Sequence, residues 1–475
     1  MAKQLFNSTE KSNFILNLTE EKYSKLAAWG LLAACFTTSL AAIIPECSTK
    51  VTYAIVASAG LTLSGILCMI FTLIAFMKGY VEKRTAVPVA AFGAVVLWAA
   101  VSMINSFDFA VGLNGFPGRG EGFLAILFYF SFFVTGISVK REKTFMVFIW
   151  GMIAAGILNS VWGLIQVFTG EIGSFTAITS EKYINAASGL AQSPLFLAML
   201  LSLSLTAAMV GTVLFDSRIS RIICLISSCL FSFVMVFTYS FIGFCGLAFA
   251  VIAAVAAVIS SKKAKARIAS VLAVIVPAAV GIVLVQAGAV GNVDGYALHD
   301  GRMLWWADSF LRLSSSGEPD SSVVDMDDTY DVYYTLNSKT LNIISNYPIT
   351  GTGPDQLVYP QLYKDSTIGG TEEDDITNVI LTNKGTFDRV YNEYLYTAAT
   401  RGIPSLIALV VLLLAALVLS FRNMKRKNSV TGAVFFAVTL CGVLLFLVGC
   451  SNTAFSPIFW AASGAGCVEL NRKVR

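Results

Sequence analysis

Apolar residues along this chain form long runs that are separated by short polar segments. The run from 222 to 259 holds 38 residues without one Asp, Glu, Lys or Arg. A single helix of that length would extend about 57 Å, whereas the hydrocarbon core of a bilayer is about 30 Å thick. We therefore predict two spans joined by a tight turn near Tyr239–Ser240. The pattern as a whole predicts an all-α polytopic membrane protein, because helices satisfy their own backbone polar groups in lipid.

The same pattern predicts about twelve transmembrane helices and one large, partly helical extracytoplasmic loop. The expected spans are Leu26–Ile44, Thr52–Met77, Ala86–Phe107, Gly122–Ser138, Thr144–Phe168, Pro194–Phe215, Ile222–Tyr239, Phe241–Ile259, Ile268–Ala287, Ile403–Phe421, Val430–Val448 and Phe455–Val468. The last is short, and its Pro457 and Gly464 favour an irregular segment. The expected organisation is a cytoplasmic tail at 1–25, nine helices in 26–287, a catalytic loop at 288–401, three helices in 402–468 and a tail at 469–475. The first 25 residues are polar, so we expect no cleavable signal peptide.

Composition supports this interpretation and excludes other classes of protein. Hydrophobic residues make up 56% of the chain and charged residues only 13%, about half the fraction of a soluble domain. The mean hydropathy is +0.73. These values exclude an ordinary soluble enzyme, a disordered chain and a nucleic-acid-binding domain.

The distribution of Lys and Arg predicts the orientation of the chain. With the expected spans, 23 of the 33 lie on one side and 3 in the short loops of the other; the remaining 7 lie in the long loop. Since cytoplasmic loops carry the excess of positive charge, both termini are expected inside and the loop 288–401 outside. We expect membrane lipid as a partner and no nucleic acid.

The long loop is acidic and is expected to hold three helices. It contains 17 Asp and Glu against 7 Lys and Arg, in no spacing that matches an EF-hand, so a solvated acidic surface is favoured over calcium binding. The expected helices are 301–313, 338–348 and 389–400. The third leads into the span from Ile403, where Pro404 is tolerated in the first helical turn.

Neither a metal site nor a cofactor is expected. The nine cysteines lie in or beside apolar runs without a CxxC pattern, and His299 is the only histidine.

Few charged residues fall within the spans, which argues against an ion-coupled transporter. A site is therefore expected at the outer mouth of the bundle and in the long loop.

Four arginines on the outer side are candidates for binding an anionic ligand. Arg119 lies with Glu121 in a glycine-rich segment, Arg302 lies beside Trp305–Trp306, and Arg389 and Arg401 flank the third loop helix. Guanidinium groups bind phosphate oxygens bidentately, so this set suits a diphosphate. Roles as interfacial anchors, surface residues or salt-bridge partners are the alternatives. Gly351 and Gly353, in "YPITGTGPDQL", form either a ligand-binding turn or an ordinary one.

Taken in order, these segments resemble the O-antigen ligase and O-antigen polymerase superfamily. "NYPITGTGPDQL" followed by "DRVYNEYLYTAATRGIPSLIALVVLLL" is similar to its double signature, in which Pro-x-x-Gly-x-Gly precedes His-Asn-x-x-Leu. Arg302 with Trp305–Trp306 looks like the family's Arg-x-x-x-Trp helix, and "GRGEGFLAILFYF" resembles a segment of Gram-positive members. The expected topology matches that of the family over the whole chain.

The resemblance implies a metal-independent membrane glycosyltransferase of surface polysaccharide synthesis. The donor would be a glycan on polyprenyl diphosphate, and the acceptor a hydroxyl of another lipid-linked repeat (polymerase) or of a lipid core or other acceptor (ligase). Arginines would stabilise the diphosphate leaving group, and a loop base would activate the acceptor. Chain-length regulators and flippase proteins are candidate partners.

Two positions depart from the family pattern. Tyr391 stands where the family has the histidine proposed as general base, which leaves Tyr391 or Glu393 to handle the proton beside Asn392. Phe241 stands where the family often has the arginine of a Ser-Arg pair, so one diphosphate contact is expected to be missing. The alternative functions are a transporter or flippase of lipid-linked oligosaccharide, and an inactive scaffold of the same fold.

Overall fold

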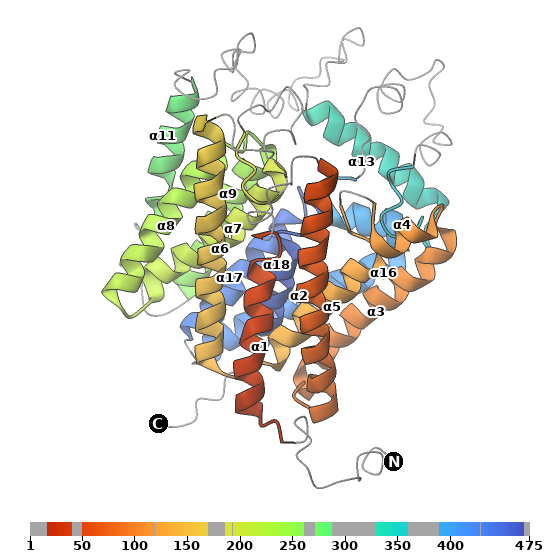
Figure 1. The fold of residues 1–475 in the computed structure, drawn as a ribbon, viewed down its shortest axis with the longest axis horizontal. Coiled ribbons are helices and arrows are strands. Elements are labelled where there is room, and N and C mark those ends of the chain that lie inside the picture. Colours follow the sequence, from red (N-terminus) through yellow and green to blue (C-terminus); the bar gives the residue numbers. More distant parts are fainter. Residues whose placement is uncertain are drawn as a thin grey trace.

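In the described part of the chain, every regular element is helical (Figure 1). The computed structural model describes residues 17–39, 50–116, 119–169, 186–191, 193–260, 271–286, 329–359, 389–427 and 429–469. The α-helices are α1 (Glu20–Cys35), α2 (Lys50–Lys78), α3 (Ala86–Ser102), α4 (Phe109–Asn114), α5 (Phe123–Ser138), α6 (Glu142–Thr169), α7 (Pro194–Leu214), α8 (Arg218–Val236), α9 (Phe241–Ser260), α11 (Ile275–Gln286), α13 (Thr329–Asn346), α16 (Glu393–Lys427), α17 (Val430–Leu445) and α18 (Ser456–Gly466).

Each of the twelve predicted spans overlaps one of these helices, which confirms the all-helical fold in the described residues. Seven of the described helices are long and apolar enough to cross a membrane. α5, α17 and α11 are shorter apolar helices, so the number of twelve spans stays a prediction. The expected turn at Tyr239–Ser240 is present between α8 and α9, with Tyr239 in a left-handed conformation at φ 47°.

Hydroxyl side chains begin several of the helices. Ser193 accepts a hydrogen bond from the Leu195 amide at the start of α7, and Ser217 and Ser429 accept in the same way at α8 and α17. Pro194 occupies the first position of α7, where a missing amide proton costs nothing. These caps satisfy amide groups that have no partner within the helix.

α7 is the central helix of the bundle. Every side chain from Phe196 to Leu214 is buried, and α6, α8, α9 and α17 pack around it. A second tight contact joins α5 and α18, where a Cβ atom on Gly136 or on Gly464 would overlap the backbone of the facing helix. Small residues at such crossings let helix backbones approach closely in membranes.

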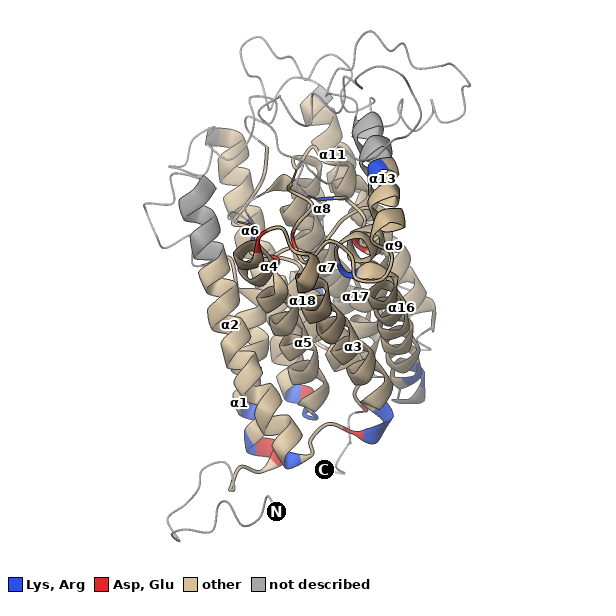
Figure 2. Cartoon of the chain, turned by 90° about the vertical axis from the view of Figure 1, so that its right-hand side faces the viewer, with Lys and Arg blue, Asp and Glu red and all other residues tan. Residues whose placement is uncertain are grey.

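One end of the bundle, which we call the charged end, is tied together by ion pairs between distant segments (Figure 2). The pairs are Lys140–Glu20, Lys140–Glu82, Arg141–Glu21, Arg84–Glu82 and Arg84–Glu469. They gather the start of α1, the α2–α3 and α5–α6 connections and the segment after α18. All of these were predicted to be cytoplasmic. The structure places them together, and the side of the membrane on which they lie stays a prediction.

Candidate active site

The end of the bundle opposite the charged end is built around a break in α16. Gly402 has φ 79°, outside the helical region, and Pro404 follows it in the first turn of the second half, as expected from the sequence. The break leaves carbonyl groups of the first half without their usual amide partners. Thr352 and Gly353 donate their amides to the Ala399 and Thr400 carbonyls at 3.0 and 2.9 Å.

The predicted glycine motif therefore stabilises α16 by supplying hydrogen-bond donors at its break. Gly351 has φ 68°, and a Cβ atom there would overlap the Thr400–Arg401 peptide. Gly353 has φ 99° and lies against Ser106. These contacts explain why the motif needs glycine, while a direct role of Gly351 and Gly353 in binding stays a prediction.

Asn392 and Glu393 fix the start of α16 against the segment after α17. The Asn392 side-chain oxygen accepts from the Tyr394 and Leu395 amides at 3.0 and 3.1 Å, so Asn392 is the N-cap of the helix. The Glu393 amide donates to the Phe446 and Gly449 carbonyls. Asn392 and Glu393 thus hold the local fold, and their predicted catalytic role stays a prediction.

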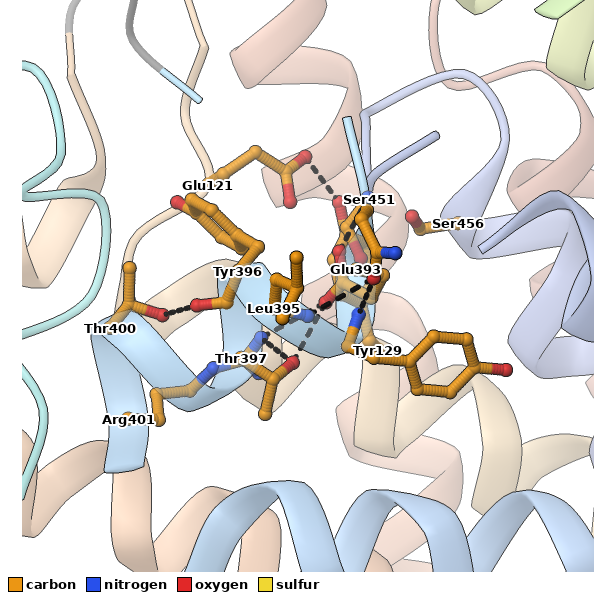
Figure 3. A network of polar contacts seen from close by, with 12 residues as sticks. Glu121, Tyr129, Glu393, Leu395, Tyr396, Thr397, Thr400, Arg401, Ser451 and Ser456 are labelled. Carbon is orange, nitrogen blue, oxygen red and sulfur yellow. Dashed lines mark hydrogen bonds and ion pairs between the residues drawn. The ribbon is translucent and has the colours of Figure 1, made fainter. Parts of the chain in front are cut away.

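Glu393 forms a buried ion pair with Arg401, two turns further along α16 (Figure 3). The Arg401 Nη2 atom lies 2.9 Å from Glu393 Oε1 and donates to Thr397 Oγ1 at 2.7 Å. Thr397 also contacts Glu393 Oε1, and the Ser451 amide donates to Oε2 at 2.8 Å. Both oxygens of Glu393 are therefore occupied by donors.

Asp355 forms a second buried ion pair, with Arg119. The Arg119 Nη1 atom lies 3.0 Å from Asp355 Oδ1, which also accepts from the Tyr396 hydroxyl at 3.1 Å. The Phe116 amide donates to Oδ2 at 2.6 Å. Arg119 lies over the Tyr396 ring, with its guanidinium carbon 5.3 Å from the ring centre. Asp355 thereby joins the segment before α5, the segment after α13 and α16.

Glu121 is a third buried carboxyl group, two residues after Arg119. Its Oε1 atom accepts from the Tyr129 hydroxyl of α5 at 2.6 Å. Burial raises the pKa of Glu121 to about 8, against the lowering influence of the Tyr129 hydrogen bond, Arg119 and Arg389. Its surroundings therefore favour the protonated form more than those of an ordinary glutamate do.

Arg389 lies just before α16 and is also buried. Its guanidinium carbon lies 4.7 Å from the centre of the Phe196 ring at the start of α7, and its Nη1 atom contacts the Cys450 sulfur at 3.8 Å. Burial raises the pKa of the Cys450 thiol to about 11, so the thiol stays protonated at neutral pH. Arg389 thus lies over a ring and beside a neutral thiol.

Six ionisable side chains meet at this end of the bundle, and we call them the charged cluster. They are Arg119, Glu121, Asp355, Arg389, Glu393 and Arg401. A cavity of about 20 Å³, enough for about one water molecule, lies among them. Its lining includes Glu121, Asp355, Glu393 and Arg401, with Tyr129, Tyr396 and Ser451. Burying so many charges in an apolar bundle is costly, and such residues mark functional sites.

The structure brings together most of the predicted site residues and adds others. Arg119, Arg389, Arg401 and Glu393 belong to the charged cluster, and Tyr391 lies half-buried beside it in the chain. The predicted Arg302, with the helix 301–313 and the acidic stretches of the loop, lies outside the described residues.

Asp355, Tyr396 and Tyr129 were missed as site residues. Asp355 lies within the quoted glycine motif, and Glu121 lies beside Arg119 in the glycine-rich segment, so both carried a local signal. Asp355 and its hydrogen-bond partner Phe116 are 239 residues apart in the sequence, and only the fold reveals that pairing. Tyr129 lies in an apolar run, where nothing local distinguishes it.

Residues 226–410 match the family described as O-antigen ligase. The match covers the second half of α8, then α9, α11, α13 and the first half of α16, and it includes the first segment of the double signature and the second as far as residue 410. It supports the predicted resemblance to the O-antigen ligase and polymerase superfamily, and with it a glycosyltransferase-type activity on surface glycans in the membrane. Comparison with curated proteins finds no match.

Proposed function

We propose that this chain, whose residues 226–410 match the O-antigen ligase family, transfers a glycan from polyprenyl diphosphate to an acceptor hydroxyl. The transfer takes place at the outer face of the bacterial cytoplasmic membrane, and elongation of a lipid-linked repeat is favoured slightly over ligation to another acceptor. The observation that carries the proposal is the charged cluster, which places three arginines at one end of an otherwise apolar bundle. Arg389, one of these arginines, is of the residue type that stabilises a diphosphate leaving group as a preorganised donor.

In the proposed reaction the acceptor oxygen attacks the anomeric carbon of the donor sugar. The bond from that carbon to the diphosphate oxygen breaks, and polyprenyl diphosphate leaves with the electron pair. Arg389 and Arg302 are the proposed diphosphate contacts. Arg119 and Arg401 each lie within 3.0 Å of a carboxylate, so their positive charge is already balanced in part. We assign these two to positioning Asp355, Glu393 and the start of α16.

The proton of the acceptor needs a base at neutral pH. A tyrosine has an ordinary pKa near 10 and is a poor base, so Tyr391 is better suited to orienting the acceptor. Glu393 has both oxygens occupied by donors, which favours a structural role. The roles of Tyr391 and Glu393 as general bases stay predictions.

Replacing Arg389 by alanine tests the assignment. R389A should lower transfer by about 100-fold to 1,000-fold, as loss of one preorganised donor does, while the protein still inserts in the membrane. The measurement is the glycan ladder of a deletion strain that carries the variant, beside its pool of lipid-linked precursor. R302A should behave in the same way.

A matched control is R141A, at the charged end, which should leave the ladder unchanged. A ladder of normal length in R389A and R302A would contradict the assignment. The glycan ladder and the pool of lipid-linked precursor together distinguish the alternative functions. Unpolymerised repeats on the outer leaflet indicate a polymerase, an intact ladder left on the carrier indicates a ligase, and repeats held on the inner leaflet indicate a flippase.

A further inference from the structure

The three carboxyl groups of the charged cluster have different surroundings. Asp355 and Glu393 each pair with an arginine and accept further hydrogen bonds, so both of their oxygens are occupied. With both oxygens occupied, neither carboxyl group presents a vacant oxygen to a substrate hydroxyl. Neither group is therefore suited to taking a proton from a substrate.

Glu121 has only one oxygen occupied. Its Oε1 atom accepts from the Tyr129 hydroxyl at 2.6 Å, and its Oε2 atom takes no hydrogen bond from any residue that the structure describes. The side chain is nearly buried, with 6% exposed, and borders the small cavity in the cluster. One oxygen of a buried carboxyl group thus remains for a water molecule or a substrate hydroxyl next to the arginines.

We propose that Glu121 is the general base that takes the proton of the acceptor hydroxyl. This inference rests on the proposed glycosyl transfer. The hydroxyl oxygen forms the new bond to the anomeric carbon, its proton passes to Glu121 Oε2, and the electron pair of the broken bond leaves with polyprenyl diphosphate. Tyr129 is a positioning residue, because its hydroxyl fixes the other oxygen of the carboxyl group.

The charges around Glu121 suit this role. Tyr129 faces it from α5, Arg119 from its own segment, Asp355 from the segment after α13 and Arg389 from the segment before α16. The ionisable groups of α16 that line the same cavity are Glu393, Tyr396 and Arg401. Burial outweighs the arginines, so the pKa of Glu121 rises to about 8. A base with a pKa near the working pH combines a useful ionised fraction with a real tendency to take the proton.

The sign of the pH dependence follows from this role. The active form of Glu121 is the carboxylate, so its amount increases as the pH rises through about 8 and is constant above that. The rate constant of the transfer step should rise over the same pH range, and we call this part of the pH–rate profile the rising limb. Without Tyr129 the carboxylate loses a donor, so the pKa of Glu121 should increase and the rising limb should move to higher pH.

Purified full-length protein in liposomes, supplied with lipid-linked repeat from the deletion strain, provides the test. In single-turnover reactions from pH 6 to 9.5, Glu121→Gln should lower the rate constant by at least about 100-fold, with the donor KM changed little and the rising limb absent. Glu121→Asp keeps a carboxylate and should retain the rising limb at a reduced rate. Tyr129→Phe should shift the limb upward. Glu142→Gln, an exposed glutamate at the start of α6, is the matched control and should match the wild type.

The outcomes separate this inference from the proposed function. Wild-type protein that transfers no glycan overturns both. Active wild type with Glu121→Gln within threefold of it, or with its rising limb intact, overturns the role of Glu121 alone. If Glu121→Gln does not fold, Tyr129→Phe decides, since an unshifted limb in that variant also contradicts the proposal.

Discussion

Asp355 shows how far a single residue can be understood from the sequence. Asp355 lies in a motif that was recognised from the sequence, but only the glycines of that motif were predicted to have a functional role. The structure gives Asp355 a left-handed conformation at φ 58°, full burial and contacts with Arg119, Tyr396 and Phe116. Hydropathy and local spacing cannot predict such pairings, because they depend on which segments the fold brings to one end of the bundle.

Replacing Asp355 by asparagine should destabilise the protein by about 3–5 kcal/mol, because Arg119 would remain buried without its counter-charge. Thermal unfolding of the purified protein in detergent measures the effect. Asp216→Asn, on an exposed turn between α7 and α8, should change little. The double variant Arg119→Gln/Asp355→Asn should lose less than the sum of the single variants, since the unbalanced charge is gone. Additive losses would show that the two side chains do not depend on each other.

At the scale of elements, α16 combines predicted and unpredicted features. A helix near 389–400 and a tolerated Pro404 were expected, and α16 with its break at Gly402 confirms both. The expected boundary between loop and membrane, at 401, falls at this break. What the sequence did not predict is that residues 348–353 replace the interrupted hydrogen bonds. That role requires two segments to lie side by side, and no local pattern indicates it.

Gly402→Ala should destabilise the protein by more than about 2 kcal/mol, because φ 79° disfavours any side chain and the new Cβ atom would overlap the Ile349 carbonyl. Gly93→Ala is the matched control. Gly93 lies in α3 with open space around its Cβ position, so alanine there should be neutral or stabilising by up to about 1 kcal/mol. The melting temperature of Gly402→Ala should therefore fall, whereas that of Gly93→Ala should stay the same or rise. Equal values would mean that the break in α16 is not constrained.

At the scale of the whole molecule, hydropathy and charge predicted the arrangement well. Long apolar runs specify helices in lipid regardless of their neighbours, so each expected span overlaps a helix of the described chain. The positive-inside pattern grouped segments that the ion pairs of the charged end do bring together. The placement of the charged cluster at the other end could not be predicted in detail, since it arises from side chains on three separate segments.

The orientation can be tested with reporter fusions. Green fluorescent protein at the C-terminus should fluoresce, because that end is predicted to be cytoplasmic. Alkaline phosphatase fused after Asn346, at the end of α13, should be active, because the long loop is predicted to lie outside. A fusion after Lys140 is the internal control and should give fluorescence without phosphatase activity. The reverse pattern would place the charged cluster on the inner face and exclude the proposed reaction.

The complete burial of α7 has a consequence for how the protein is made. Its side chains face only protein, and part of its cover comes from α17, which lies near the other end of the chain. Since the ribosome completes α17 long after α7 has entered the bilayer, α7 must first be surrounded by lipid on the face that α17 later takes. Apart from four hydroxyl side chains, the surface of α7 is apolar, and it thus serves membrane insertion before it serves packing. The core around α7 is therefore not closed until α17 has been made.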